Sequence, residues 1–149
     1  MLFQKGNIRA GFTLIELLVV IAVGAVVFAV VGSQMGRLVS KQALLTSAHD
    51  VALVANRAHI SAREAKDNQA WGIASVSSNQ YALVSGSAAA PTISATYGLK
   101  SAISFVNTPF AIWFGQGTGY ATATVITLTN PTNDTRQVSV STFGTVEVP

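Results

Sequence analysis

The sequence predicts an α+β protein in which one long N-terminal helix packs on a C-terminal antiparallel β-sheet. Two observations lead to this fold class. Residues 12–31 are apolar apart from one acid, Glu16, and no proline interrupts the chain before Pro91, so a helix can continue well beyond the apolar run. After residue 68 charged side chains become rare, and short runs of Val, Ile, Thr and aromatic residues alternate with turn residues, which is typical of strands.

We expect a single helix over residues 12–67, made of two different parts. Residues 12–32 are apolar on all sides and, at the rise of an α-helix, extend about 30 Å, which is enough to cross a bilayer. In residues 33–68 apolar positions recur three, four or seven apart with charged residues between them, which predicts an amphipathic helix that needs a partner surface. The first part is therefore predicted to be transmembrane, and the second to pack on the sheet.

Residues 69–149 form the predicted β-domain. They hold only four charged side chains, and apolar and polar residues alternate within the runs, as they do in half-buried strands. Turn-forming residues separate the runs, most clearly at residues 130–134. The strands are expected at residues 71–77, 80–85, 99–106, 110–114, 122–129, 137–141 and 145–148.

The net charge of +3 is concentrated at the N-terminus, since residues 1–11 hold Lys5 and Arg9 and no acid. A basic segment before an apolar one favours a cytoplasmic N-terminus, although Arg37 and Lys41 beyond the other end weaken that signal. A cleaved secretory signal peptide fits less well, because the apolar run is longer than a usual signal core and contains Glu16. An acid within an apolar membrane segment is costly, so a functional partner for it is expected.

Residues 5–17, Lys-Gly-Asn-Ile-Arg-Ala-Gly-Phe-Thr-Leu-Ile-Glu-Leu, resemble the class III leader of type IV prepilins and type II secretion pseudopilins. The resemblance implies that a prepilin peptidase cuts between Gly11 and Phe12 on the cytoplasmic face, with Lys5 and Arg9 as the basic anchor of the leader. It also implies that the new amine of Phe12 is N-methylated. In a filament core Glu16 would pair with the amine of a neighbouring subunit, because a buried carboxylate needs a cation.

The strand pattern of residues 71–146 resembles the GspH/FimT domain of minor pseudopilins and minor type IV pilins. The matching segments are Trp71-Gly72-Ile73, Tyr81-Ala82-Leu83, Ile103-Ser104-Phe105, Val125-Ile126-Thr127-Leu128, Arg136-Gln137-Val138-Ser139-Val140 and Gly144-Thr145-Val146. This resemblance implies the pilin fold and a minor rather than a major subunit. Ser33 agrees with a minor subunit, because major pilins often carry proline at the matching position.

Catalytic machinery is not expected. The chain has no cysteine, which excludes thiolate nucleophiles, thiolate metal sites and disulfides. Its two histidines, His49 and His59, are about 15 Å apart along a helix, too far to bind one metal ion. The Gly-Gln-Gly-Thr-Gly run at residues 115–119 lacks the lysine and the following helix of a phosphate-binding loop, and is interpreted as a flexible hairpin loop. We expect neither an enzyme nor a cofactor or metal.

Nucleic-acid binding is not favoured either. The basic residues Arg57, Arg63 and Lys66 are interleaved with Glu64 and Asp67, which is typical of a solvated helix face. Only two basic residues follow position 68, so the β-domain lacks the basic surface that nucleic-acid binding needs.

Together these features predict a minor pilin-like structural subunit of a type II secretion pseudopilus or a type IV pilus. The expected partners are prepilin peptidase, other pilins or pseudopilins through the N-terminal helix, the inner-membrane assembly platform and membrane lipid. The chain would first be a single-pass inner-membrane protein, and later part of a periplasmic pseudopilus or surface pilus. The alternatives are a membrane-anchored binding domain that does not polymerise, and a minor pilin for DNA uptake.

Overall fold

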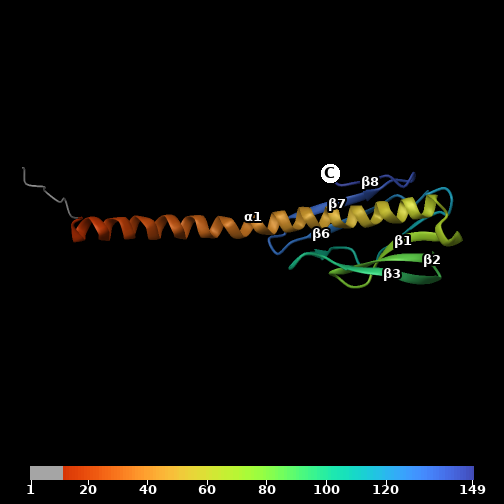
Figure 1. Ribbon diagram of the computed structural model, residues 1–149, viewed down its shortest axis with the longest axis horizontal. Helices are drawn as coiled ribbons and strands as arrows, with labels where there is room; N and C mark the ends of the chain where they lie inside the picture. Colours follow the sequence, from red (N-terminus) through yellow and green to blue (C-terminus); the bar gives the residue numbers. More distant parts are fainter. Residues whose placement is uncertain (1–11) are drawn as a thin grey trace, which may run out of the picture. The chain divides into compact units, whose positions relative to one another are not determined.

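The computed structural model describes residues 12–149 of the chain, except for the side chains of residues 30–34. The described part of the chain divides after Gly36 into two units, which are described separately below. One helix, α1 (Leu14–Arg63), contributes residues to both units (Figure 1). The α+β class is confirmed, because this helix packs in its second part against antiparallel sheets.

Helix α1 begins with a cap built from a Thr-x-x-Glu motif. The Thr13 hydroxyl accepts a hydrogen bond of 3.3 Å from the backbone N–H of Glu16. The carbonyl oxygen of Thr13 accepts bonds from the N–H groups of Glu16 (3.1 Å) and Leu17 (3.2 Å). A threonine at this position satisfies backbone donors that have no partner within the helix, and a glutamate three residues later completes the sequence pattern of a capping box.

The helix ends at Arg63, four residues before the expected end. The backbone enters the left-handed region at Ala65, where φ is 49°, and again at Asp67 and Asn68, so the chain turns away from the helix axis. A short 3₁₀ helix, η1 (Lys66–Asn68), lies in this turn. Because a helix usually turns this way at a glycine, an alanine gives no signal in the sequence.

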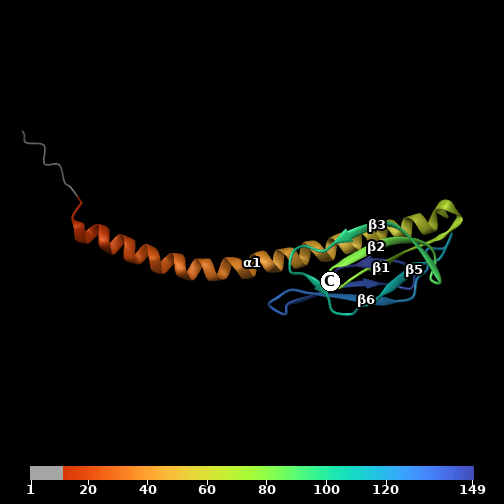
Figure 2. The same cartoon turned by 90° about the horizontal axis from the view of Figure 1, so that it is seen from below.

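The β-domain contains two four-stranded antiparallel sheets rather than the single sheet that the sequence predicts. One sheet has the order β3-β2-β1-β5, and its strands are labelled in Figure 2; the other sheet has the order β4-β6-β7-β8. The strands of the first sheet are β1 (Ala70–Ser75), β2 (Gln80–Ser87), β3 (Ala90–Gly98) and β5 (Ala111–Phe114). The strands of the second are β4 (Ser104–Phe105), β6 (Thr124–Thr129), β7 (Thr135–Val140) and β8 (Val146–Glu147).

Two strand predictions were wrong. Strand β3 was missed because most of its side chains are exposed and Pro91 lies near its start, although residues 92–97 alternate between polar and apolar and the strand pairs with β2. Of the strand expected at residues 99–106, only the two residues of β4 form a strand. Residues 99–103 turn instead, with φ of 65° at Ala102 and a 3.1 Å hydrogen bond from the N–H of Ile103 to the carbonyl of Lys100.

The core of residues 37–149 lies between α1 and both sheets, which flank the helix in Figure 1. On the helix the buried face consists largely of small residues, among them Ala48, Ala55, Ala58 and Ala62, each with no exposed surface. Small side chains let the helix approach the sheets closely, where larger ones fill the space from the other side. These larger side chains are Trp71, Ile73, Tyr81, Phe105, Phe114, Ile126, Leu128 and Val138.

Hydrogen bonds also connect the helix and the two sheets around this core. The Ser47 hydroxyl on α1, almost fully buried, accepts a bond of 3.2 Å from the N–H of Lys100 in the loop after β3. The N–H of Phe105 in β4 donates a 2.8 Å bond to the carbonyl of Ser78, which links one sheet to the β1–β2 turn of the other. The helix and both sheets therefore form one packed unit.

Among the residues that the structure describes, no helix combines the length and the hydrophobicity of a membrane span, in contrast to the expectation for residues 12–32.

Candidate functional site

The first part of α1 presents an uncovered apolar surface. Every large apolar side chain from Phe12 to Phe28 is more than half exposed, with fractions from 54% to 81%. These side chains are Phe12, Leu14, Ile15, Leu17, Leu18, Val19, Val20, Ile21, Val23, Val26, Val27 and Phe28. Since they follow one another without a polar face, the surface surrounds the helix. Apolar surface of this extent in a folded protein marks a site that lipid or other chains cover.

Glu16 is the single charged side chain on this apolar surface. It lies in the first turn of α1, where a negative charge interacts favourably with the helix dipole. Its side chain is exposed, and no basic side chain among residues 12–149 forms an ion pair with it. The carboxylate is thus available for a cation that another molecule supplies.

Phe12 precedes Glu16 by one helical turn and is 81% exposed. The other predicted processing residues, Lys5, Arg9 and Gly11, lie outside the residues that the structure describes. Cleavage between Gly11 and Phe12 and methylation of Phe12 therefore stay predictions.

The glycine-rich run at residues 115–119 packs against the end of α1 and is not a free hairpin loop. The N–H of Gly117 donates a 2.7 Å bond to the carbonyl of Ala62 in the last turn of the helix. The Gln116 side chain donates a 2.6 Å bond to the side-chain oxygen of Asn68. Gly119 has φ of +71°, and a β-carbon there would lie 2.6 Å from Nε2 of His59. Close packing against α1 explains Gly119, and the positive φ of +72° explains Gly117.

His59 lies beneath two loops. Its ring is 5.4 Å from the ring of Phe114, centroid to centroid, and a β-carbon on Gly144 would come within 2.6 Å of it. Burial lowers the pKa of His59 below its usual value, and the positive charge of Arg63 lowers it further. His49 is exposed. Within residues 12–149, no three His, Asp or Glu side chains gather as metal ligands.

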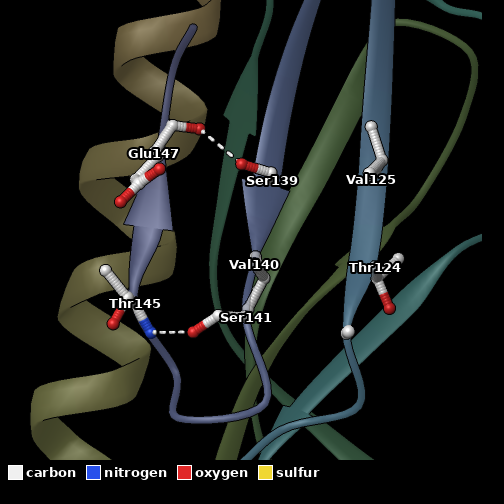
Figure 3. A pocket seen from close by; sticks show the side chains of 8 residues that line it. Thr124, Val125, Ser139, Val140, Ser141, Thr145 and Glu147 are labelled. Atoms are coloured by element: carbon white, nitrogen blue, oxygen red, sulfur yellow. Dashed lines mark hydrogen bonds between the residues drawn. The ribbon is translucent and has the colours of Figure 1, made fainter.

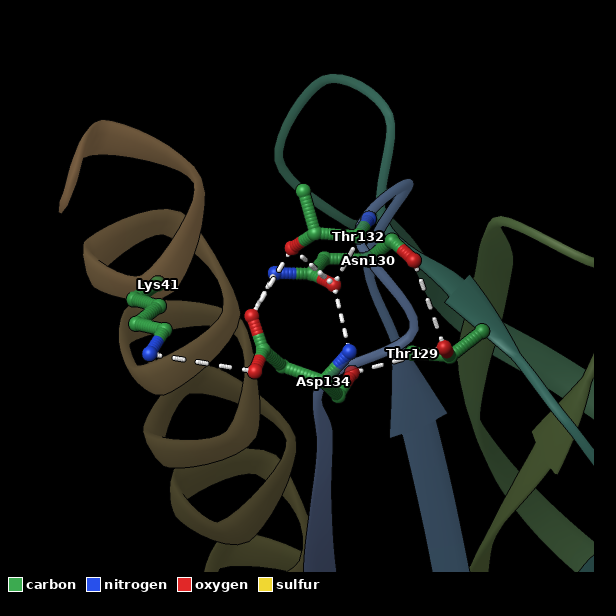
Figure 4. Close-up of polar contacts among 5 residues, drawn as sticks. All are labelled: Lys41, Thr129, Asn130, Thr132 and Asp134. Carbon is green, nitrogen blue, oxygen red and sulfur yellow. Dashed lines mark hydrogen bonds and ion pairs between the residues drawn. The ribbon is translucent and has the colours of Figure 1, made fainter. Parts of the chain in front are cut away.

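A polar cluster joins the β6–β7 turn to α1 (Figure 4). The buried side-chain oxygen of Asn130 accepts bonds from the N–H of Thr132 (3.1 Å) and of Asp134 (2.8 Å), while its amide donates to the Asp134 carboxylate (3.1 Å). Lys41 on α1 forms an ion pair of 3.8 Å with that carboxylate. The hydroxyl of Thr132, the amide of Asn130 and the charges of Lys41 and Arg37 hold the pKa of Asp134 below its usual value.

An open groove of about 380 Å³ lies over β6, β7 and β8 (Figure 3). It is lined by Ala123, Thr124, Val125, Ser139, Val140, Ser141, Thr145 and Glu147. Ser141 accepts a 3.1 Å bond from the N–H of Thr145, and the Ser139 hydroxyl lies 3.5 Å from the carbonyl of Glu147, to which it donates. Among these eight residues Glu147 is the one ionisable side chain, so the groove offers no acid–base pair.

Comparison with protein-family models matches residues 6–32 to the prokaryotic N-terminal methylation motif. Comparisons with curated proteins and with solved structures gave no significant match. The matched segment contains Gly11, Phe12 and Glu16 and covers most of the apolar surface on α1. Such a leader indicates a membrane-anchored protein. The chain thus carries the leader signature of type IV pilins and pseudopilins at residues 6–32.

Proposed function

We propose that the chain is a minor subunit of a type II secretion pseudopilus or a type IV pilus, with a structural rather than an enzymatic role. The observation that carries this proposal is the apolar surface around residues 12–28, which directly follows the cleavage position of the methylation motif. A helix of this kind is stable in lipid and also in the core of a helical filament. One surface can therefore serve the membrane-anchored subunit and the assembled one.

Processing at the leader creates the second part of the assembly site. Prepilin peptidase removes residues 1–11 on the cytoplasmic side, where Lys5 and Arg9 retain the leader. The new amine of Phe12, which is then methylated, is a cation at the start of α1. Until assembly the chain is held in the inner membrane with this end in the cytoplasm, and the assembly platform then moves it into a periplasmic or surface filament.

Glu16 sets the position of each subunit against its neighbours. When the helices pack, the apolar side chains around Glu16 exclude water, and an unpaired carboxylate there would be strongly destabilising. The Phe12 amine of a neighbouring subunit provides the missing cation. The GspH/FimT-like strand pattern supports the minor role, with the β-domain facing outward toward secreted proteins or tip partners.

The test compares Glu16→Gln with Glu64→Gln, an exposed acid directly after the last turn of the same helix, as the matched control. Both variants are expressed with a pilus or pseudopilus machinery, and the protein is measured in the membrane fraction and in sheared filaments. We expect Glu16→Gln to stay in the membrane fraction and to be lost from filaments, because the amide cannot neutralise the amine. Glu64→Gln should enter filaments like the unchanged chain. Normal incorporation of Glu16→Gln would contradict the proposal.

Mass spectrometry of the mature N-terminus tests the processing step separately. We expect a chain that begins with methylated Phe12. An intact Met1 in membranes with active prepilin peptidase would point instead to a membrane-anchored domain that does not polymerise.

A further inference from the structure

Three basic side chains gather at the beginning of the unit formed by residues 37–149. Arg37 and Lys41 lie one turn apart on α1, and Arg136 comes from β7; all three are exposed. Lys41 and Arg136 line the same open cleft, together with Asp134. Asp134 is the one acid of this cleft and pairs with Lys41, while the guanidinium of Arg136 donates a 3.3 Å hydrogen bond to the carbonyl oxygen of Pro149.

The polar cluster of the β6–β7 turn places Arg136 beside the helix. Asn130 and Thr132 fix the carboxylate of Asp134 through hydrogen bonds, and this carboxylate pairs with Lys41 at 3.8 Å. Arg136 follows Asp134 by two residues and is held by the same strand. The ion pair therefore aligns the basic residue of the sheet with those of the helix.

Large apolar side chains accompany these charges. Leu38 and Val39, in the same stretch of α1 as Arg37 and Lys41, are 66% and 65% exposed. A helical surface that combines exposed aliphatic side chains with arginine and lysine has the composition of segments that lie at a membrane–water interface. Further along α1, Leu53 and Ile60 are also exposed near Arg57 and Arg63, but there Glu64 directly follows Arg63.

The place of the cluster in the chain argues for lipid as its partner. Arg37 and Lys41 come directly after the N-terminal apolar unit, on the side where the positive-inside rule disfavours basic residues. Residues directly after a membrane segment lie at the level of the lipid headgroups. Anionic phospholipid headgroups lie at that depth and have the opposite charge.

We propose that Arg37, Lys41 and Arg136, together with Leu38 and Val39, form a docking surface for anionic phospholipid headgroups on the periplasmic face of the inner membrane. We call these five residues the basic surface. It holds the β-domain against the membrane until the subunit is extracted into a filament. This inference rests on the proposed membrane anchoring and adds a second, charge-dependent contact to it.

The experiment uses the full chain in nanodiscs of phosphatidylcholine alone or of phosphatidylcholine with phosphatidylglycerol. Because the chain has no cysteine, a single spin label can be attached at Pro131→Cys, in the exposed turn next to the basic surface. A label at Tyr120→Cys, in the exposed loop beside Gly119, is the reference position. Electron paramagnetic resonance then measures how far each label is immobilised and shielded at the lipid surface.

We expect the label at residue 131 to contact the surface when phosphatidylglycerol is present, and the label at residue 120 to stay free. The double variant Arg37→Gln/Arg136→Gln keeps the pair of Lys41 with Asp134 but removes two cations. It should lower the ratio of bound to free label about 25-fold, about fivefold for each charge. The control Arg57→Gln/Lys100→Gln removes the same charge elsewhere and should leave the ratio unchanged.

Equal contact in both kinds of nanodisc, or normal contact of Arg37→Gln/Arg136→Gln, would overturn the inference while leaving the proposed function intact. Failure of the chain to insert into either nanodisc would overturn both. If the label at residue 131 responded to added duplex DNA but not to phosphatidylglycerol, the inferred partner would be an anionic polymer and not lipid.

Discussion

The backbone N–H of Gly117 donates a 2.7 Å hydrogen bond to the carbonyl oxygen of Ala62. The same carbonyl accepts a 3.0 Å bond from the N–H of Ala65, so Gly117 supplies a second donor at the end of α1. The loop between β5 and β6 is thereby fastened to the helix end, and Gly119 lets it approach His59 and Arg63 closely.

Gly144→Ala should destabilise the folded protein by about 1–3 kcal/mol. At this position φ is +79°, and the new β-carbon would lie 2.4 Å from the carbonyl oxygen of Gly119 and 2.6 Å from the ring of His59. Gly98→Ala is the control, because no atom lies within 4 Å of a β-carbon there. Urea unfolding of the full chain in detergent measures both, and an equal effect of the two substitutions would argue against the tight packing of Gly144.

Stability should fall on acidification through His59. Its pKa is lowered from 6.5 in the folded protein, so between the lowered pKa and about pH 6.5 the unfolded chain binds more protons. The free energy of unfolding is therefore highest above about pH 6.5, decreases as the pH falls through this window and then levels off. Burial and Arg63 are the causes of the lowered pKa, and no acid offsets them.

The urea midpoint measured from about pH 7.5 to about pH 5 tests this dependence. His59→Gln should flatten the curve in the window below the ordinary histidine pKa. His49→Gln is the matched control, since His49 lies on the exposed side of the same helix and should leave the curve as it is. A pH dependence that survives His59→Gln but disappears in His49→Gln would contradict the prediction, because it would show that His49 rather than His59 causes the effect.

Asn130→Ala should cost about 2–3 kcal/mol of stability. The Asn130 side chain is 3% exposed, accepts bonds from Thr132 and Asp134 and donates one to the Asp134 carboxylate, so its loss leaves several groups without partners. In the same turn, Asn133→Gly should leave the stability nearly unchanged, because glycine also tolerates the φ of 59° at this position. Thermal unfolding followed by circular dichroism compares the two, and a neutral Asn130→Ala would show that the cluster contributes little.

Much of the fold follows from local patterns in the sequence. Helix α1, the pairing of β1 with β2 and that of β6 with β7 are each marked by periodicity and turn residues close to the observed bounds. Strand β3 carries a weaker mark, because Pro91 lies near its start and most of its side chains face solvent, although it pairs with β2 directly before it in the chain. The division into two sheets depends instead on pairings such as that of β1 with β5, which join distant parts of the chain.

The candidate site was predictable only in part. Phe12 and Glu16 are identified by fixed spacing at the start of an apolar run, and both are exposed as an assembly role requires. The cap at Thr13 was missed, although Thr-x-x-Glu before an apolar run is a readable signal. The approach of Arg136 to Lys41 could not be predicted, because the two lie on different elements and meet only through the tertiary packing of Asp134.

The small-residue face of α1 between the two sheets also determines how the β-domain resists mechanical force. From Leu44 to Ala62 one face of the helix packs against side chains of both sheets along several turns, while Leu53 and Ile60 stay exposed. Tension applied along the axis of this segment must shear all these contacts at once, whereas a pull on the two-residue strand β8 would peel it away pair by pair. A subunit that is drawn by its N-terminal helix is therefore loaded in its strongest direction.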